Sequence, residues 1–220
     1  FCSTAITPRS RNGVASIARQ FDNDIQPIQD GSSLMFDFMK KNSVVPTKGI
    51  APQLPPFHDI AEYAKSRNVE YLVHFTHTEN LPSIASNGLM TLSNLKRKEI
   101  NYRFNDDQRL DNLPNTCSLT VTFPNYRMFY KYRRRSDSDW AVILLDAVNV
   151  LANCECIFNF TNAANHELRD TPIAGRKGLE AFKRMFDKPS LRTENCLSDD
   201  EPTDPQAEVL CLCDIPPQFF

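Results

Sequence analysis

The sequence predicts one domain that mixes strands with helices and follows a long N-terminal arm. Apolar and polar residues alternate over 71–76 and 117–123, which is the period of half-buried strands. A continuous apolar run at 140–146 indicates a buried strand, and residues 178–187 place apolar side chains at helical spacing. With 220 residues, of which 41% are hydrophobic, the chain can bury a substantial core.

Residues 1–57 contain few regular signals, because prolines and glycines recur along them. Apolar residues at helical spacing over 17–28 favour a short helix there. We interpret 1–57 as an N-terminal arm or extension that packs on a domain formed by 58–220. The alternative is a lid or a segment that binds a partner. A short helix over 59–67 is expected to lead into the first strand.

Charge is unevenly distributed along the chain, although the net charge is only −2. Lysine and arginine dominate residues 96–135, and acidic residues dominate 187–214. A basic segment can follow a phosphate backbone, but such runs are more often simply solvated faces. No apolar run reaches the length of a membrane span, and no secretory leader is visible. Because the chain begins with Phe1, we expect the true start to be missing, with any signal it carried.

The seven cysteines are an odd number in a chain of this size, which argues against a disulfide framework. The pairs Cys154/Cys156 and Cys211/Cys213 could in principle form a four-thiolate zinc site, but zinc ligands usually have at least two residues between them. Both pairs sit among isoleucine, phenylalanine, leucine and valine. The sequence therefore favours buried free thiols in a reducing compartment, and we expect no metal site.

The first strand and the segment after it form the main candidate site. His74 and Thr76 are two residues apart on the strand, so their side chains project from the same face. Thr78 can cap a short helix that follows, and Gly88 supplies a left-handed stop. A histidine and a threonine just before a helix N-terminus suit a polar ligand that carries phosphate. A histidine at a strand end more often serves structure, so this signal is weak alone.

Two later segments add to this pattern. The polar and basic stretch 93–116 indicates a loop, and the strand after it places hydroxyls on one face, at Ser118, Thr120 and Thr122. The helix predicted at 126–135 alternates aromatic rings with arginines. A surface that stacks on bases and contacts phosphates requires both kinds of side chain. An ordinary amphipathic helix would have a similar sequence.

A carboxylate, Glu208, opens the otherwise apolar strand predicted at 207–213, directly after an acidic loop at 190–205. A charge at that position lies either at the solvent edge or in a site.

These features together resemble the DarT family of DNA-base ADP-ribosyltransferases, the toxins of DarT/DarG-type toxin–antitoxin systems. The resemblance covers roughly residues 70–217 and occurs in four stretches in the family's order. They are 74–76 (His-Phe-Thr) with 80–84 (Asn-Leu-Pro-Ser-Ile) and 88–89 (Gly-Leu); 109–111 (Arg-Leu-Asp); 118–130 (Ser-Leu-Thr-Val-Thr-Phe-Pro-Asn-Tyr-Arg-Met-Phe-Tyr); and 203–210 (Thr-Asp-Pro-Gln-Ala-Glu-Val-Leu).

The resemblance implies an α+β fold, the ADP-ribosyltransferase fold, with two small facing β-sheets and flanking helices around a cleft for NAD, which is consumed as substrate. It implies that His74 and Thr76 hold the nicotinamide end and its ribose, and that Asn80 supports the turn of the first helix. Arg109 would bind the phosphates of NAD or position the substrate, with Arg103 of the same loop as the alternative.

The resemblance also implies that Glu208 is the catalytic carboxylate, assisted by Arg109. The product would be a base of single-stranded DNA that carries ADP-ribose, and the DNA would contact the basic aromatic helix. The expected DNA-contacting residues are Tyr126, Arg127, Tyr130 and Arg133.

The family context implies a cytoplasmic, prokaryotic toxin of a toxin–antitoxin or phage-defence system, restrained by an antitoxin with de-ADP-ribosylating activity and without a membrane partner. Residues 122–127 read Thr-Phe-Pro-Asn-Tyr-Arg, where the thymidine-modifying branch has a Tyr-Phe-Asn/Ala-Pro-Arg type of stretch. This departure favours guanine ahead of thymine. Transfer to an RNA base stays open. Transfer to a protein side chain also stays open, since Gln206 and Glu208 fit a Gln-x-Glu spacing. A catalytically silent module that binds nucleic acid is a further alternative.

Overall fold

The computed structural model describes residues 54–104, 113–134, 139–163, 165–169 and 171–220. All of these residues belong to one compact unit, which comprises 52–220. The predicted arm at 1–57 lies outside the described residues except for its last four, so its packing stays a prediction. Within the described ranges, no helix has both the length and the apolar character needed to cross a membrane.

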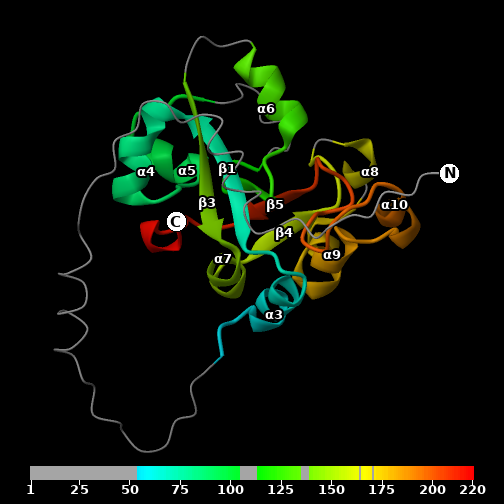
Figure 1. Ribbon diagram of the computed structural model, residues 1–220. Coiled ribbons are helices and arrows are strands. Elements are labelled where there is room, and N and C mark those ends of the chain that lie inside the picture. Colours follow the sequence, from blue (N-terminus) through cyan, green and yellow to red (C-terminus); the bar gives the residue numbers. More distant parts are fainter. Residues whose placement is uncertain (1–53, 105–112, 135–138, 164, 170) are drawn as a thin grey trace, which may run out of the picture. The chain divides into compact units, whose positions relative to one another are not determined.

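Five strands form one antiparallel sheet in the order β3-β1-β2-β5-β4 (Figure 1). The strands are β1 (Tyr71–His77), β2 (Cys117–Val121), β3 (Trp140–Asp146), β4 (Cys156–Asn159) and β5 (Glu208–Cys211). The strands β1, β2, β3 and β5 lie where the sequence predicts strands, and the mixed helix and strand class is confirmed. β2 is shorter than predicted, because Thr122 adopts a positive φ of 63° and donates its hydroxyl to the Asp200 carbonyl at 2.9 Å.

The two facing sheets that the family resemblance implies are not confirmed, because β2 joins both halves of the sheet. Thr120 and Val121 pair with β1, whereas Cys117, Ser118 and Leu119 pair with β5. β1 therefore pairs with β2 only through Leu72 and Val73, although β1 continues to His77. Beyond Val73 the ladder between β1 and β2 ends, so the two strands separate there.

The helices of the described residues are α3 (His58–Ser66), α4 (Leu81–Asn87), α5 (Leu92–Arg97), α6 (Tyr126–Arg133), α7 (Ala147–Asn153), α8 (His166–Arg169), α9 (Gly178–Arg184) and α10 (Pro189–Glu194). Short 3₁₀ turns occur at η1 (Thr78–Asn80), η2 (Ile173–Arg176) and η3 (Pro217–Phe219). Helix α10 begins one residue before the segment 190–205, which the sequence predicts as a loop, and occupies the first five residues of that segment. Its first residue is a proline, whose fixed φ favours a helix start.

The helix after β1 begins later than predicted. Thr78 does not cap it, because the backbone N–H and the hydroxyl of Thr78 both donate to the Asp139 carbonyl, at 3.1 and 3.4 Å. A 3₁₀ turn follows, and α4 starts at Leu81 with Pro82 in its first turn. The predicted stop is confirmed, since Gly88 ends α4 with φ 81°.

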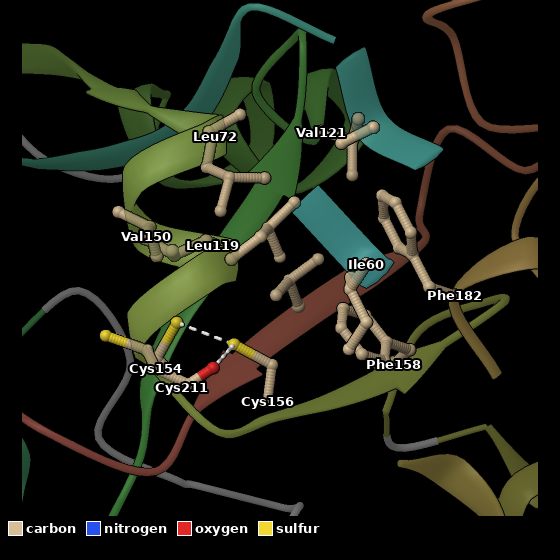
Figure 2. Close-up of a cluster of buried hydrophobic side chains, with 14 of the residues drawn as sticks. Ile60, Leu72, Leu119, Val121, Val150, Cys154, Cys156, Phe158, Phe182 and Cys211 are labelled. Carbon is tan, nitrogen blue, oxygen red and sulfur yellow. Dashed lines mark hydrogen bonds between the residues drawn. The ribbon is translucent and has the colours of Figure 1, made fainter. Parts of the chain in front are cut away.

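The hydrophobic core lies between the sheet and the helices α3, α7 and α9. Figure 2 shows Ile60 of α3, Leu72 of β1, Leu119 of β2 and Phe182 of α9 converging there. Leu72 and Phe182 are completely buried, and each such side chain stabilises the fold by about 1.5–3 kcal/mol. Figure 1 places α6 at the other end of β1 and β3, away from α3 and α7.

The thiols Cys154, Cys156 and Cys211 are buried in this core and form no disulfide, whereas Cys213 is half-buried (Figure 2). Their predicted burial is confirmed for these three residues. Among the residues that the structure describes, no three or more histidine, cysteine or acidic side chains are placed to hold a metal ion.

Candidate active site

A cleft of about 530 Å³ opens where β1 and β2 separate. Residues 73–76 of β1 and 117–120 of β2 form its floor, and Glu208 of β5 reaches it from the neighbouring strand. Helices α4, α5 and α6 and the segment 102–104 contribute its walls. This volume lies within the usual range for small-molecule sites.

His74 bridges the gap that the interrupted ladder leaves. Its Nδ1 lies 3.0 Å from the backbone carbonyl oxygen of Ser118. A carbonyl can only accept, so Nδ1 donates the proton and the ring orientation is fixed. The side chain lines the cleft and is half-buried. The predicted position of His74 in a site is therefore consistent with the geometry, although its role stays a prediction.

Thr76 and Asn80 form a buried polar pair at the end of β1. Asn80 Nδ2 donates to Thr76 Oγ1 at 2.9 Å and to the Arg103 carbonyl at 2.9 Å, while Asn80 Oδ1 accepts from the Arg103 backbone N–H at 2.8 Å. One amide thus fixes a hydroxyl and a peptide unit together. Because Thr76 Oγ1 accepts from Asn80, its own proton can serve another acceptor in the cleft.

Arg103 lines the cleft and forms an ion pair with Glu79, with 42% of its side chain exposed. The predicted Arg109 lies outside the described residues. Arg103, the alternative, is held at its backbone by Asn80, and its guanidinium pairs with Glu79.

Glu208 begins β5 and is only 9% exposed, yet its carboxylate lines the cleft. Oε2 accepts from the backbone N–H of Ala163 at 2.9 Å, and Oε1 accepts from Asn162 Nδ2 at 3.4 Å. Such donors offset the cost of holding a charge away from water. The pairing of Asn159 with Glu208 brings the loop after β4 beside the carboxylate.

The sequence reasoning did not select Asn162 and Ala163, which hold the carboxylate of Glu208. The sequence shows a loop of small polar residues directly after β4, and short side chains leave its backbone N–H groups accessible. That pattern is the signal that could have identified the loop as a carboxylate support.

Helix α6 forms one wall of the cleft and is anchored by aromatic contacts. The rings of Phe129 and Tyr132 pack on Phe75 of β1 with centroids 5.0 and 6.3 Å away, and on Trp140 of β3 at 5.8 and 6.3 Å. The ring of His77 lies against Trp140, with the centroids 3.9 Å apart and the ring planes tilted by 34°. Burial, and then the charge of Arg103, lower the pKa of His77, which keeps its ring neutral.

The predicted DNA-contacting residues of α6 point in different directions. Arg127 lines the cleft. Tyr126 and Tyr130 are 57% and 63% exposed on the outer face of the helix, and the guanidinium of Arg127 lies 5.9 Å from the Tyr126 ring. Arg133 lies 5.6 Å from the ring of Phe129. Three further residues of α6 line the cleft without having been predicted: Met128, Lys131 and Tyr132.

The sequence of this cleft matches a known family. The family model DarT, described as ssDNA thymidine ADP-ribosyltransferase, matches residues 73–220, from β1 to the end of the chain. The chain belongs to the DarT family. It is therefore an ADP-ribosyltransferase that uses NAD as substrate and acts on single-stranded DNA. The DarT match begins one residue before His74 and includes every predicted site residue. A comparison with curated proteins found no match.

Proposed function

We propose that the cleft between β1 and β2 is where this DarT protein transfers ADP-ribose from NAD to a DNA base, with Glu208 as the catalytic carboxylate. The observation that carries the proposal is that Glu208 lines the same cleft as His74 and Thr76, which lie far from it in the sequence. The protein has the two kinds of group that the reaction needs, a fixed carboxylate and polar side chains opposite it.

The chemistry explains why a held carboxylate is required. Loss of nicotinamide leaves a ribose with developing positive charge, which a preorganised negative group stabilises. Glu208 is preorganised by Ala163 and Asn162, so it need not reorient during the reaction. The same carboxylate can bind a ribose hydroxyl and accept the proton from the attacking base nitrogen. His74 and Thr76 then hold the nicotinamide end of NAD, and Arg103 or Arg109 binds its phosphates.

The outer face of α6 is our candidate for the surface that binds the DNA strand. Tyr126 and Tyr130 are one helical turn apart and exposed, and Arg134 lies 5.7 Å from the Tyr130 ring. Exposed rings with adjacent guanidinium groups provide stacking together with phosphate neutralisation. Because Arg127 and Lys131 line the cleft on the next face of the helix, a strand on α6 can deliver a base into it.

The double substitution Tyr126→Ala/Tyr130→Ala is expected to raise KM for single-stranded DNA by about ten-fold or more, since stacking contributes about 1–3 kcal/mol per base. KM for NAD should stay close to that of the unaltered protein. Tyr71→Ala is the matched control, because Tyr71 is an exposed tyrosine of β1 outside the cleft lining. An unchanged KM for DNA in the double variant would show that these two tyrosines of α6 do not contribute to DNA binding.

Oligonucleotides that lack one kind of base identify the base that is modified. The DarT description names thymidine, whereas residues 122–127 depart from the thymidine-modifying pattern and favour guanine. We expect labelled NAD to mark oligonucleotides that contain thymine but lack guanine, as the family description supports. Label on oligonucleotides that contain guanine but lack thymine would support guanine instead. Label confined to RNA or to proteins of a lysate would contradict the DNA assignment for this cleft.

The family resemblance also supports a role as the toxin of a toxin–antitoxin or phage-defence system. The expected partner is an antitoxin that removes ADP-ribose from DNA. Expression of the chain alone should then arrest growth, and co-expression with a de-ADP-ribosylating antitoxin should relieve the arrest. Growth arrest that persists in a variant unable to transfer ADP-ribose would argue against this role.

A further inference from the structure

A group of thiols that the transfer reaction does not use lies across three strands of the sheet. Cys211 of β5 lies directly opposite Cys156 of β4 and Cys117 of β2. Directly opposite residues of antiparallel strands present their side chains on the same face. Figure 2 shows Cys154, Cys156 and Cys211 side by side at the edge of the core cluster. Cys213 lies two residues beyond the end of β5 and is half-buried.

The backbone geometry selects one pair from this group. The N–H of Leu212 donates to the Glu155 carbonyl at 2.9 Å, just beside the Cys156–Cys211 pair. This bond makes Cys156 and Cys211 a non-hydrogen-bonded pair, in which the Cα atoms lie roughly 4.5 Å apart. That separation falls within the range of roughly 4.4–6.8 Å that a disulfide requires. Their sulfur atoms are 3.2 Å apart.

Cys117 is the poorer partner for Cys211. The N–H and C=O of a strand residue point to the same side of the strand. Cys211 directs neither group toward Cys156, so both point toward β2, and Cys211 forms a hydrogen-bonded pair with Cys117. The side chains of a hydrogen-bonded pair are farther apart than those of a non-hydrogen-bonded pair. The Cys117 thiol instead donates to the Leu89 carbonyl at 3.3 Å.

We propose that Cys156 and Cys211 form a reversible disulfide when the protein meets hydrogen peroxide. The O–O bond of the peroxide breaks, one S–S bond forms, and both thiol protons leave in two molecules of water. The disulfide ties β4 to β5, the strand pair that carries Glu208 at its other end. A dithiol such as dithiothreitol should reverse it by thiol–disulfide exchange.

We assign the first step to Cys154, whose side chain is 5% exposed, against 3% for Cys156 and 0% for Cys211. Side-chain hydrogen bonds with Cys211 and then Cys213 lower the pKa of the Cys154 thiol, which favours the thiolate, the nucleophilic form. Its sulfur attacks the peroxide and becomes a sulfenic acid, with loss of hydroxide. The Cys211 sulfur displaces water from Cys154 to form a first disulfide. Cys156 then attacks Cys211, which releases the Cys154 thiolate and a proton.

The test uses the full chain with Cys2→Ser and Cys196→Ser, which remove the thiol in the arm and the exposed thiol of Cys196. After peroxide treatment, unfolding and alkylation, mass spectrometry should count two fewer alkylated thiols among the five that remain, and dithiothreitol should restore all of them. Peptide mapping should locate the bond at Cys156 and Cys211. Full alkylation, stepwise oxygen addition without a disulfide, or a bond elsewhere would overturn the proposal.

Variants in this background separate the roles of the thiols. Cys211→Ala should abolish the loss of alkylation, and Cys117→Ala should leave it unchanged. Cys154→Ser should give the same disulfide at a rate at least ten-fold lower, because the attacking thiolate is gone. A melting curve of each reduced variant shows that it is folded, and Cys156→Ala replaces Cys211→Ala if the latter is not. An unchanged rate in Cys154→Ser would contradict the route through Cys154.

Discussion

Replacement of Glu208 by glutamine is expected to lower the rate of ADP-ribose transfer about 100- to 1,000-fold, which is the usual cost of removing one preorganised electrostatic group. The amide keeps the shape of the side chain, and its oxygen can still accept from the Ala163 N–H. Asn162 can turn its own amide to suit the new donor. The fold should therefore persist. The measurement is the initial rate with labelled NAD and single-stranded DNA, together with the affinity for NAD.

Glu62→Gln is the matched control, because Glu62 is an exposed carboxylate of α3 that does not line the cleft. It should retain the full transfer rate. A folded Glu208→Gln variant with an unaltered rate would show that another group performs the chemistry. Loss of both transfer and the melting transition would indicate a structural role for Glu208, and binding of NAD by the variant distinguishes the two outcomes.

The strands could be predicted because each has a local signature. β1, β2 and β3 show the alternation or the apolar run of their type, and the structure places all of them at the predicted positions. Their order in the sheet has no such signature. Whether β2 pairs with β1 or β5 depends on contacts between distant segments, and β2 in fact pairs with both through different halves. The cleft arises from that division, so its position was not visible in the sequence.

The helices were predicted less completely, for reasons that particular residues explain. The apolar run of β3 continues into α7 without a change of composition. What ends the strand is Asp146, whose side chain accepts from the Asn149 N–H at 2.9 Å and caps α7. An aspartate at the end of an apolar run is a recognisable cap signal, but here this single residue marks the boundary between β3 and α7. The capping of α6 by Asn125, in contrast, occurs at a predicted break.

The candidate site shows the same limits. His74 and Thr76 are two apart on a strand, and Glu208 stands out as a charge at the head of an apolar one, so sequence alone selects them. The groups that hold Glu208 are a backbone N–H and an asparagine in a short loop, and a backbone donor leaves no mark in a sequence. Asn80 was expected to support the helix turn. Its amide instead holds Thr76 and the backbone of Arg103, contacts that only the folded chain reveals.

Substitution of Gly88 by alanine is expected to destabilise the protein by about 3 kcal/mol or more, through strain of about 1–2 kcal/mol and loss of hydrogen bonds worth about 1 kcal/mol each. Gly88 has φ 81°, and an added Cβ would lie 2.2 Å from the Ile215 carbonyl oxygen. The chain cannot easily move away, because Leu89 and Ile215 exchange two backbone hydrogen bonds at 2.9 and 2.8 Å. Thermal unfolding should show a midpoint lower by roughly 6–12 °C.

Gly178→Ala separates the clash from the backbone strain. Gly178 has nearly the same φ, 78°, but among the described residues no atom lies within 4 Å of the added Cβ. This variant should lose only about 1–2 kcal/mol, the cost of the left-handed conformation. Equal losses in the two variants would mean that the contact between Gly88 and Ile215 relaxes at no cost. A larger loss for Gly88→Ala would show that the close approach of these two segments, beside the cleft that Gly88 lines, is a rigid part of the fold.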